Sequence, residues 1–408
     1  MKKGFIYVIL SGIILGACAD HSFRSYATSV TVDAENIPVM LIVGDPSYTL
    51  MSKGAGAIAP NEGFYWENSR VYVYSFKRDL TTAFDVTSSE DNENCLVDGS
   101  VETPGFPGGK KARLNSLDTY ISWEEKSQNV FYPPTQYGYD FYGYYLDDIE
   151  PAPGDYLRSA DGIQFKVKID GTQDLMSAKA RLTRQQLEKE DLSPEEREQI
   201  QKYYYSSYTA RRNIVPILYF KHHLVRLRFE IYPGSKKSNR VYVDSVVVAS
   251  KTRAVFTVAH KSEDRMGLDF TADNRYEYLS LKERGGGPLE PDCYHTDYWG
   301  DYNKPVFERE GVRVGESLLV APDQSYKLRI HLKEWADEHH SGEPVTSVNY
   351  LTLQNTEQKF QPGMQYTVRV AVYGLQQVEV EVTPEPWGNG GDINVDEDEN
   401  FSKNQLIL

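Results

Sequence analysis

A two-residue alternation of apolar and polar side chains limits the second half of this chain to β structure. From residue 225 to residue 231, Val225, Leu227, Phe229 and Ile231 alternate with arginines and a glutamate. Successive side chains of a strand point to opposite faces of a sheet, so each such strand has one buried and one solvated face. Strands of this kind are typical of antiparallel sheets. The pattern therefore predicts a β-sandwich in this half of the chain.

The same alternation near the end of the chain predicts a hairpin. Valines recur at every second position over 368–372 and again over 378–382, and residues 373–376 supply the turn. Further strands are predicted at 40–43, 70–76, 139–145, 165–169, 241–248 and 326–332. Short strands separated by Gly- and Pro-rich turns indicate an all-β fold of sandwich type.

One stretch, residues 178–204, is predicted to be helical. Within it, Ser193 can cap a helix, Pro194 fits the first helical position, and Glu196 completes a capping box. The stretch is rich in Gln, Glu, Lys and Arg and has few apolar anchors. We expect an exposed helical insertion near the domain junction rather than a core helix.

The start of the chain has the pattern of a bacterial lipoprotein signal peptide. Two lysines precede an apolar stretch over residues 4–15, and Leu15-Gly16-Ala17-Cys18 follows. The apolar stretch is too short and wrongly flanked for a membrane-spanning helix. We expect cleavage before Cys18 and acylation of its thiol by several chains, which gives stable membrane anchoring where one chain does not. Residues 1–18 are then the signal and lipobox, and residues 19–36 a polar tether.

Composition excludes one class of partner. The net charge of −15 repels phosphate backbones and argues against nucleic-acid binding. The hydrophobic fraction of 40% lies below the usual ~45–50%, which indicates thin cores of sandwich type. The 30 tyrosines, against 16 phenylalanines, fit half-buried strands whose side chains have a wet tip.

With Cys18 acylated, two cysteines remain. A disulfide between Cys95 and Cys293 is compatible with an oxidising envelope. Both residues lie in loop-like sequence and far apart, so we favour two unpaired thiols, and the sequence leaves the question open.

The chain offers no constellation of an enzyme or of a bound cofactor. His222-His223 and His339-His340 are adjacent pairs, and neighbours on a strand point to opposite faces, so neither pair is expected to chelate a metal ion. We expect His222 to be packed at a strand start and the second pair to be solvated. A nucleophile elbow of the Gly-x-Ser-x-Gly type is absent from the sequence.

An aromatic loop over residues 292–302 is a candidate ligand site. It contains Tyr294, Tyr298, Trp299 and Tyr302 among three aspartates. Aromatic rings can stack on sugar rings while carboxylates bind hydroxyl groups, and loops carry function more often than strands do. A monomeric glycan-binding surface lipoprotein is therefore one of two hypotheses for this chain.

Five motifs, in order along the chain, resemble those of the fimbrillin-like lipoproteins, the subunits of type V pili in Gram-negative anaerobes. They are Phe141-Tyr142-Gly143-Tyr144-Tyr145 (with Leu146 where the family often has proline), Gln173-Asp174-Leu175-Met176-Ser177-Ala178, Phe220-Lys221-His222-His223-Leu224, Phe360-Gln361-Pro362-Gly363-Met364-Gln365-Tyr366 and Trp387-Gly388-Asn389-Gly390-Gly391.

The resemblance implies two tandem antiparallel β-sandwich domains of transthyretin-like type. They would span residues 37–212, including the insertion at 178–204, and residues 213–388, before an acidic tail at 389–408. It also implies a non-enzymatic subunit for pilus assembly and cell adhesion, lipid-anchored in the outer membrane and displayed on the cell surface. Its partners would be other fimbrial subunits, joined by strand donation, and a host or glycan receptor.

In the resembling polymerising subunits, an arginine-specific protease cuts between the first strands and opens a groove. This chain has Arg24 but no further arginine before Arg70, and the intervening loop offers only Lys53. Cutting after Arg24 would release the lipid and keep the strand near residues 39–43. We therefore expect an accessory, tip or anchor subunit rather than a stalk subunit.

Overall fold

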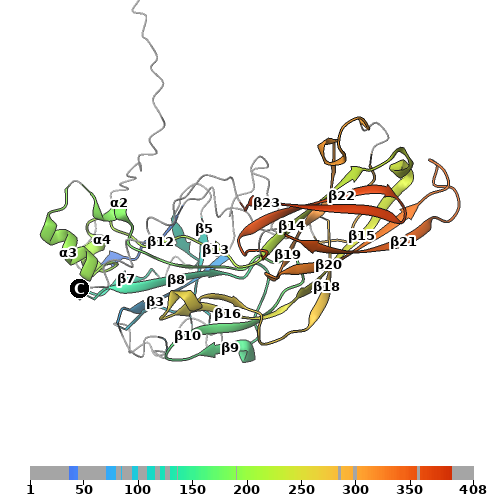
Figure 1. The fold of residues 1–408 in the computed structure, drawn as a ribbon. Coiled ribbons are helices and arrows are strands. Elements are labelled where there is room, and N and C mark those ends of the chain that lie inside the picture. Colours follow the sequence, from blue (N-terminus) through green and yellow to red (C-terminus); the bar gives the residue numbers. More distant parts are fainter. Residues whose placement is uncertain are drawn as a thin grey trace, which may run out of the picture.

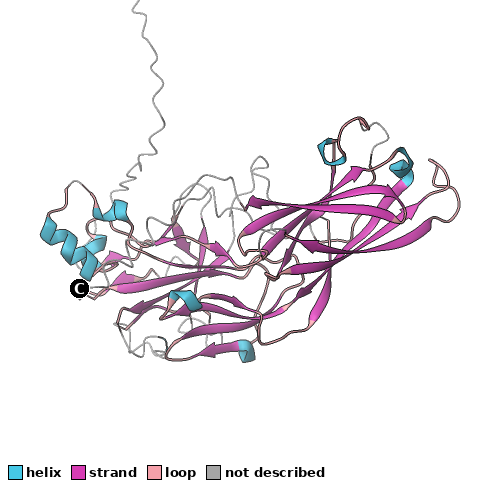
Figure 2. Ribbon diagram, viewed as in Figure 1, coloured by secondary structure: helices cyan, strands magenta, loops and turns pink. Residues whose placement is uncertain are grey.

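The computed structural model describes residues 36–44, 70–79, 84, 94–99, 108–114, 120–124, 129–135, 137–189, 191–283, 286–296, 301–355 and 359–387. Strands dominate this part of the chain, and the helices are few and short (Figure 2). The strands form two sandwiches that lie side by side along the long direction of the molecule (Figure 1). The predicted all-β fold is confirmed.

The first sandwich packs a seven-stranded sheet against a four-stranded sheet. The larger sheet has the order β13 (Lys221–His222), β11 (Met176–Lys179), β8 (Tyr139–Tyr145), β3 (Arg70–Lys77), β5 (Lys110–Leu114) and β6 (Ile121–Trp123), with β4 (Cys95–Val97) also paired to β3. The smaller sheet has the order β17 (Gly267–Asp269), β16 (Arg253–His260), β10 (Gly162–Lys168) and β9 (Tyr156–Arg158). An aromatic core fills the space between them and includes Phe76, Tyr142, Phe165 and Phe256.

The second face of the seven-stranded sheet is also covered. Apolar side chains of β3, β8 and β11 pack there against the segment at residues 37–43 and against three short helices. The helices are α2 (Arg184–Leu187), α3 (Pro194–Lys202) and α4 (Ser207–Ala210), and Figure 1 places them at the end of the molecule away from the second sandwich.

The helical insertion is therefore present but differs from the prediction. Residues 176–179 form strand β11, and the rest of the stretch is broken into short helices instead of one. Ser193 caps α3 with the predicted capping box to Glu196. The expectation of a wholly exposed insertion was wrong, because Leu187, Leu192 and Ile200 are buried in the core against the sheet. Three well-spaced apolar residues are enough to anchor such short helices.

The second sandwich consists of two four-stranded sheets around one aliphatic core. One sheet has the order β19 (Val312–Val320), β14 (Val225–Pro233), β22 (Met364–Gly374) and β23 (Gln377–Pro386). The other has the order β18 (Tyr276–Ser280), β15 (Val241–Lys251), β20 (Ser325–Glu334) and β21 (Val345–Gln354). The predicted hairpin is β22–β23, and β14 pairs with β22 in parallel.

One strand pair crosses between the sandwiches. β16 and β17 follow β15 in the chain, yet they join the smaller sheet of the first sandwich, where β16 pairs with β10 over residues 162–168. The chain then returns to the second sandwich at β18. The division at residues 212 and 213 stays a prediction, and this excursion ties the two sandwiches together.

Short 3₁₀ turns complete the described structure at η4 (Pro153–Asp155), η5 (Lys236–Arg240), η6 (Glu263–Arg265) and η7 (Val306–Glu308). Across the described residues, we find no helix with the length and apolar character that crossing a bilayer requires. Cys95 and Cys293 are both free thiols, as favoured from the sequence.

Candidate functional site

The segment at residues 36–44 is held between two separate parts of the first sandwich. On one side β1 (Ile37–Pro38) pairs antiparallel with β7 (Phe131–Tyr132). On the other side β2 (Ile42–Val43) pairs in parallel with β12 (Ile217–Leu218). Backbone bonds extend both ladders, since Val39 N–H donates to the Val130 carbonyl (2.8 Å) and Gly44 N–H to the Leu218 carbonyl (3.0 Å). The segment is thus a strand-like insert, as the sequence predicted for residues 40–43.

Four alternate side chains of this segment lie in one core, and Ile42 between two of them is also buried. Ile37, Val39, Leu41 and Val43 are buried in the core beneath the seven-stranded sheet. Met40 lies on the opposite side and is 43% exposed. Burying an apolar side chain of this size stabilises the fold by about 1.5–3 kcal/mol. The segment is therefore an integral part of the core.

A pocket of about 300 Å³ opens beside the segment. Pro38, Val39 and Met40 line one side of it, and residues 120–123 line another. Met40 and Tyr120 are both exposed at this place. The segment therefore leaves free volume along its outer side.

Three motifs that are far apart in the sequence meet where the sandwiches join. The imidazole Nδ1 of His222 lies 2.7 Å from Oδ2 of the buried Asp174. Trp387, which follows β23, stacks on the His222 ring with the centroids 4.0 Å apart. Asp174 N–H in turn donates to Asp147 Oδ2 (3.2 Å), and burial raises the pKa of Asp147 to about 6. The prediction that His222 is a packed residue is confirmed.

His223 makes separate contacts from those of His222. Its Nε2 lies 2.7 Å from Ser177 Oγ, and its ring packs edge-on against Phe256. Burial lowers the pKa of His223 to about 4, because the charged ring would lose its hydration. Within the described ranges, no three His, Cys, Asp or Glu side chains group in a way that could hold a metal ion.

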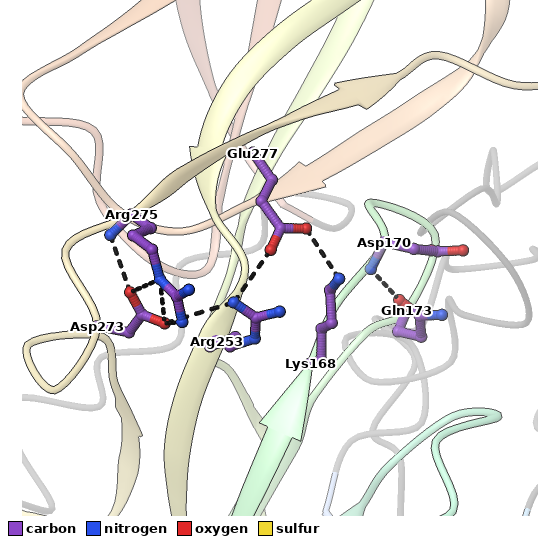
Figure 3. Close-up of polar contacts among 7 residues, drawn as sticks. All are labelled: Lys168, Asp170, Gln173, Arg253, Asp273, Arg275 and Glu277. Atoms are coloured by element: carbon purple, nitrogen blue, oxygen red, sulfur yellow. Dashed lines mark hydrogen bonds and ion pairs between the residues drawn. The ribbon is translucent and has the colours of Figure 1, made fainter.

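A chain of charged residues also links the sandwiches (Figure 3). Glu277 on β18 contacts Lys168 on β10 at 2.9 Å and Arg253 on β16 at 3.3 Å. Hydrogen bonding to Lys168 lowers the pKa of Glu277, although partial desolvation opposes the shift. At one end of this row of charged side chains, Arg275 pairs with Asp273 and lowers the pKa of that carboxyl. These charges bridge β10, β16 and β18 across the junction of the two sandwiches.

The predicted aromatic ligand site is only partly within the described residues. The Tyr294 hydroxyl donates a hydrogen bond to Glu283 Oε1 (2.6 Å), and the side chain packs at the edge of the core of the second sandwich. Tyr302 donates to the Ser235 carbonyl (3.4 Å) and lies under the Arg309 guanidinium. The two tyrosines make separate packing contacts. Tyr298 and Trp299 lie outside the described residues.

The remaining predicted site residues also fall outside the described ranges. These are Cys18, Arg24 and Lys53, so acylation and cleavage stay predictions. His340 corrects the expectation of a solvated pair, because its ring stacks on Trp335 with centroids 4.8 Å apart and its Nε2 lies 3.2 Å from the Tyr242 hydroxyl. His339 is exposed, as expected.

Sequence reasoning missed one surface, on the outer face of β18, β15, β20 and β21. Tyr278, Arg329 and Tyr350 come together there from three strands. One feature of the sequence could have indicated it. Tyr278 and Arg329 each stand at an outward-facing position of a strand with alternating apolar and polar residues. The sequence alone does not say that these strands belong to one sheet.

Comparison with known proteins finds neither a matching family model nor a match among curated proteins. Solved structures do match. A candidate cell adhesion protein from Bacteroides uniformis is 14% identical, with 87% of this chain and 100% of that chain covered and a TM-score of 0.44. A fimbrial protein from Bacteroides vulgatus is 13% identical, with coverages of 78% and 92% and a TM-score of 0.42. The fimbrial anchor protein Mfa2 from Porphyromonas gingivalis is 9% identical, with coverages of 86% and 98% and a TM-score of 0.32.

These three neighbours are cell adhesion and fimbrial proteins. They are of the same kind as the family that the sequence motifs resemble.

Proposed function

We propose that this chain is a non-enzymatic, surface-displayed subunit of an adhesive fimbria that joins its partners by exchange of a β-strand. The observation that carries the proposal is the segment at residues 36–44, which pairs with β7 and β12 at its two ends and buries four alternating apolar side chains. Removing such a segment uncovers unpaired backbone groups and an apolar groove, which a strand from another subunit can fill by β-augmentation.

A lipid-anchored accessory, tip or anchor position in the fimbria is the role that we favour. Acylation at Cys18 would hold the chain in the outer membrane. Cutting after Arg24 would release the lipid, but it would leave the segment at 37–43 joined to the chain and the groove filled. Only a cut after the segment, as at Lys53, would free it, and an arginine-specific protease has no site between residues 25 and 69.

The test is to cut the chain after the segment and measure exchange. A specific protease site placed between residues 45 and 69 would allow the cut in purified protein. We expect the cut chain to keep its segment without a covalent bond and then to exchange it for a labelled peptide of residues 36–44. A peptide with the same composition in scrambled order is the control.

Two outcomes would contradict the proposal. One is a cut chain that neither releases its segment nor takes up the labelled peptide under conditions that keep it folded. The other is surface protein that remains strictly monomeric in cells. N-terminal analysis of the surface protein then decides the position. An acylated start at Cys18 supports an anchor, and a free start after Arg24 or Lys53 supports incorporation into the fibre and contradicts a permanent anchor.

A further inference from the structure

The outer face of the sheet β18-β15-β20-β21 has an unusual composition. Alternate residues of β20 point inward and are buried, including Leu328, Ile330 and Leu332. The residues between them point outward, because side chains alternate along a strand. They are Lys327, Arg329 and His331.

Three tyrosines stand on the same face. Tyr276 and Tyr278 on β18 are 51% and 47% exposed, and Tyr350 on β21 is 72% exposed. A cluster of exposed aromatic side chains on one face is typical of a surface that binds a ligand or partner.

Arg329 lies between two of the rings. Its guanidinium carbon is 3.7 Å from the ring centroid of Tyr278 and 5.6 Å from that of Tyr350, and it donates a hydrogen bond to the Tyr278 hydroxyl. Arg329 and Tyr350 are direct neighbours in the β20–β21 register. Cation–π contacts of this kind hold the guanidinium in place and leave less side-chain entropy to lose on binding.

The charge of this face is opposite to that of the chain. The outward positions of residues 276–280 on β18, 245–251 on β15, 325–331 on β20 and 346–354 on β21 carry Lys251, Lys327 and Arg329 and no carboxylate. Carboxylates stand at the border of this area. Tyr276 donates to Asp323 at one side, and at the other Lys333 pairs with Asp244 (3.3 Å) and Asp292 (3.1 Å). Because the whole chain has a net charge of −15, this face stands out as a positive surface that attracts anions.

Shape and composition decide which anion fits. Few aliphatic side chains are exposed on these strands, with Val345 and Val348 on the edge strand β21, so the face lacks the apolar centre of a protein interface. The strands β18 and β21 are three strand spacings apart, about 14 Å between their backbones. Both rings lean toward Arg329, whose guanidinium carbon is 3.7 Å from the Tyr278 centroid and 5.6 Å from the Tyr350 centroid, so the ring centres lie closer together than the backbones. That spacing suits a ligand with at least two linked rings.

We propose that this face binds an acidic glycan. A sugar ring stacks on the exposed ring of Tyr350, and a carboxylate or sulfate group of the glycan takes two hydrogen bonds from the Arg329 fork, which Tyr278 holds in place. If the chain is the adhesive subunit proposed above, this site would determine the class of receptor that it binds. Binding is measured on the isolated monomer, so a failure here leaves strand exchange untouched, and the reverse also holds.

The experiment titrates the purified chain, without its predicted signal peptide, with three acidic probes and measures binding. The probes are oligogalacturonate, sialyllactose and a chondroitin sulfate oligosaccharide, and methyl-esterified oligogalacturonate is the neutral counterpart of the first. We expect at least one acidic probe to bind, and added salt to weaken that binding. If oligogalacturonate is the probe that binds, methyl esterification should abolish its binding.

Variants locate the site. Tyr350→Ala and Arg329→Gln should each weaken the affinity at least tenfold, and Arg329→Lys should recover only part of it because the planar fork is lost. Arg184→Gln and Tyr137→Ala change an exposed arginine and an exposed tyrosine of the first sandwich, and they should bind as the parent chain does. Circular dichroism checks that all five variants are folded.

Three results would overturn the assignment. The first is that none of the acidic probes binds. The second is that binding persists unchanged in both Arg329→Gln and Tyr350→Ala. The third is that poly-glutamate or a single-stranded oligonucleotide binds equally well and with the same dependence on Arg329, which would make the face a general polyanion surface.

Discussion

The indole ring of Trp387 stacks on the imidazole ring of His222, with the ring planes 15° apart. His222 lies on β13, at the edge of the seven-stranded sheet of the first sandwich, and Trp387 directly follows β23 of the second. The contact therefore joins the two sandwiches through residues 165 positions apart in the chain (387 − 222). Asp174, from a third motif, bonds to the same imidazole and completes the junction.

Trp387→Ala should destabilise the chain by about 3–5 kcal/mol, because it removes a buried aromatic side chain and leaves a cavity. Trp387→Phe should cost less, since it keeps a ring on His222 and removes an indole N–H that is buried without a hydrogen-bond partner among the described residues. Urea unfolding measures both. Tyr350→Ala, at a 72% exposed ring, is the control and should stay within about 0.5 kcal/mol. Equal effects of Trp387→Ala and the control would show that the junction is not packed as described.

The neutral form of His223 should make stability depend on pH. Its folded pKa, about 4, lies below the unfolded value of about 6.5, so protonation favours the unfolded chain. The contribution is fully present above pH 6.5 and is lost as the pH falls to 4, by up to roughly 3 kcal/mol. Asp147 acts in the opposite sense, since its raised pKa of about 6 gives stability that is lost as the pH rises to 6.

The measurement compares urea midpoints at pH 7.5 and pH 4.5. His223→Gln keeps a hydrogen-bonding group near Ser177 and cannot protonate, so it should show a smaller loss at pH 4.5 than the parent chain. His339→Gln changes an exposed histidine and should follow the parent chain. If His223→Gln loses as much stability as the parent chain between the two pH values, the assignment of this pH dependence to His223 is wrong.

The local sequence pattern was sufficient to predict where strands lie, but not which strands pair with each other. The strand β8 was predicted over 139–145 from its aromatic residues. The alternation predicted the β22–β23 hairpin, because a short turn leaves adjacent strands one way to pair. It did not predict that β16 pairs with β10, since that pairing joins residues about 90 positions apart and depends on the whole core. The broken helices were missed for the same reason. Ile200 looks like an isolated apolar residue until the sheet beneath it is known.

The candidate sites also depend on contacts between residues far apart in the chain, which the local sequence does not show. Asp174, His222 and Trp387 were each noted as parts of motifs, but their contact depends on how two sandwiches dock. Tyr294 and Tyr302 were chosen because aromatic loops often bind ligands, yet hydrogen bonds to Glu283 and to the Ser235 carbonyl tie them to the fold. Exposed aromatic residues on a sheet face carried no comparable local signal.

Glu277→Gln should loosen the sandwiches relative to each other with little change in thermal stability. The substitution removes the charge that pairs with Lys168 and Arg253 across the junction, and exposed ion pairs contribute little to stability. Distance distributions between spin labels at Leu157 and Thr352, one on each sandwich, should broaden. In the parent chain, 0.5 M salt should broaden them in the same direction by screening.

The control for the junction is Glu188→Gln, which removes an exposed pair with Arg184 inside one helical segment. It should leave the distance distribution unchanged. A distribution in Glu277→Gln that matches both the parent chain and this control would mean that the charged network does not set the docking of the sandwiches.

Two neighbouring residues of the inserted segment should differ sharply in their effect on stability. Leu41 is 1% exposed and packs in the core under the seven-stranded sheet, so Leu41→Ala should cost about 2–5 kcal/mol in urea unfolding. Met40 is 43% exposed, and Met40→Ala should cost less than about 1 kcal/mol. In a chain cut after the segment, Leu41→Ala should also speed exchange for the labelled peptide, because fewer apolar contacts hold the segment in its groove. Equal costs for the two substitutions would mean that the segment lies on the surface, and strand exchange would then lose its structural basis.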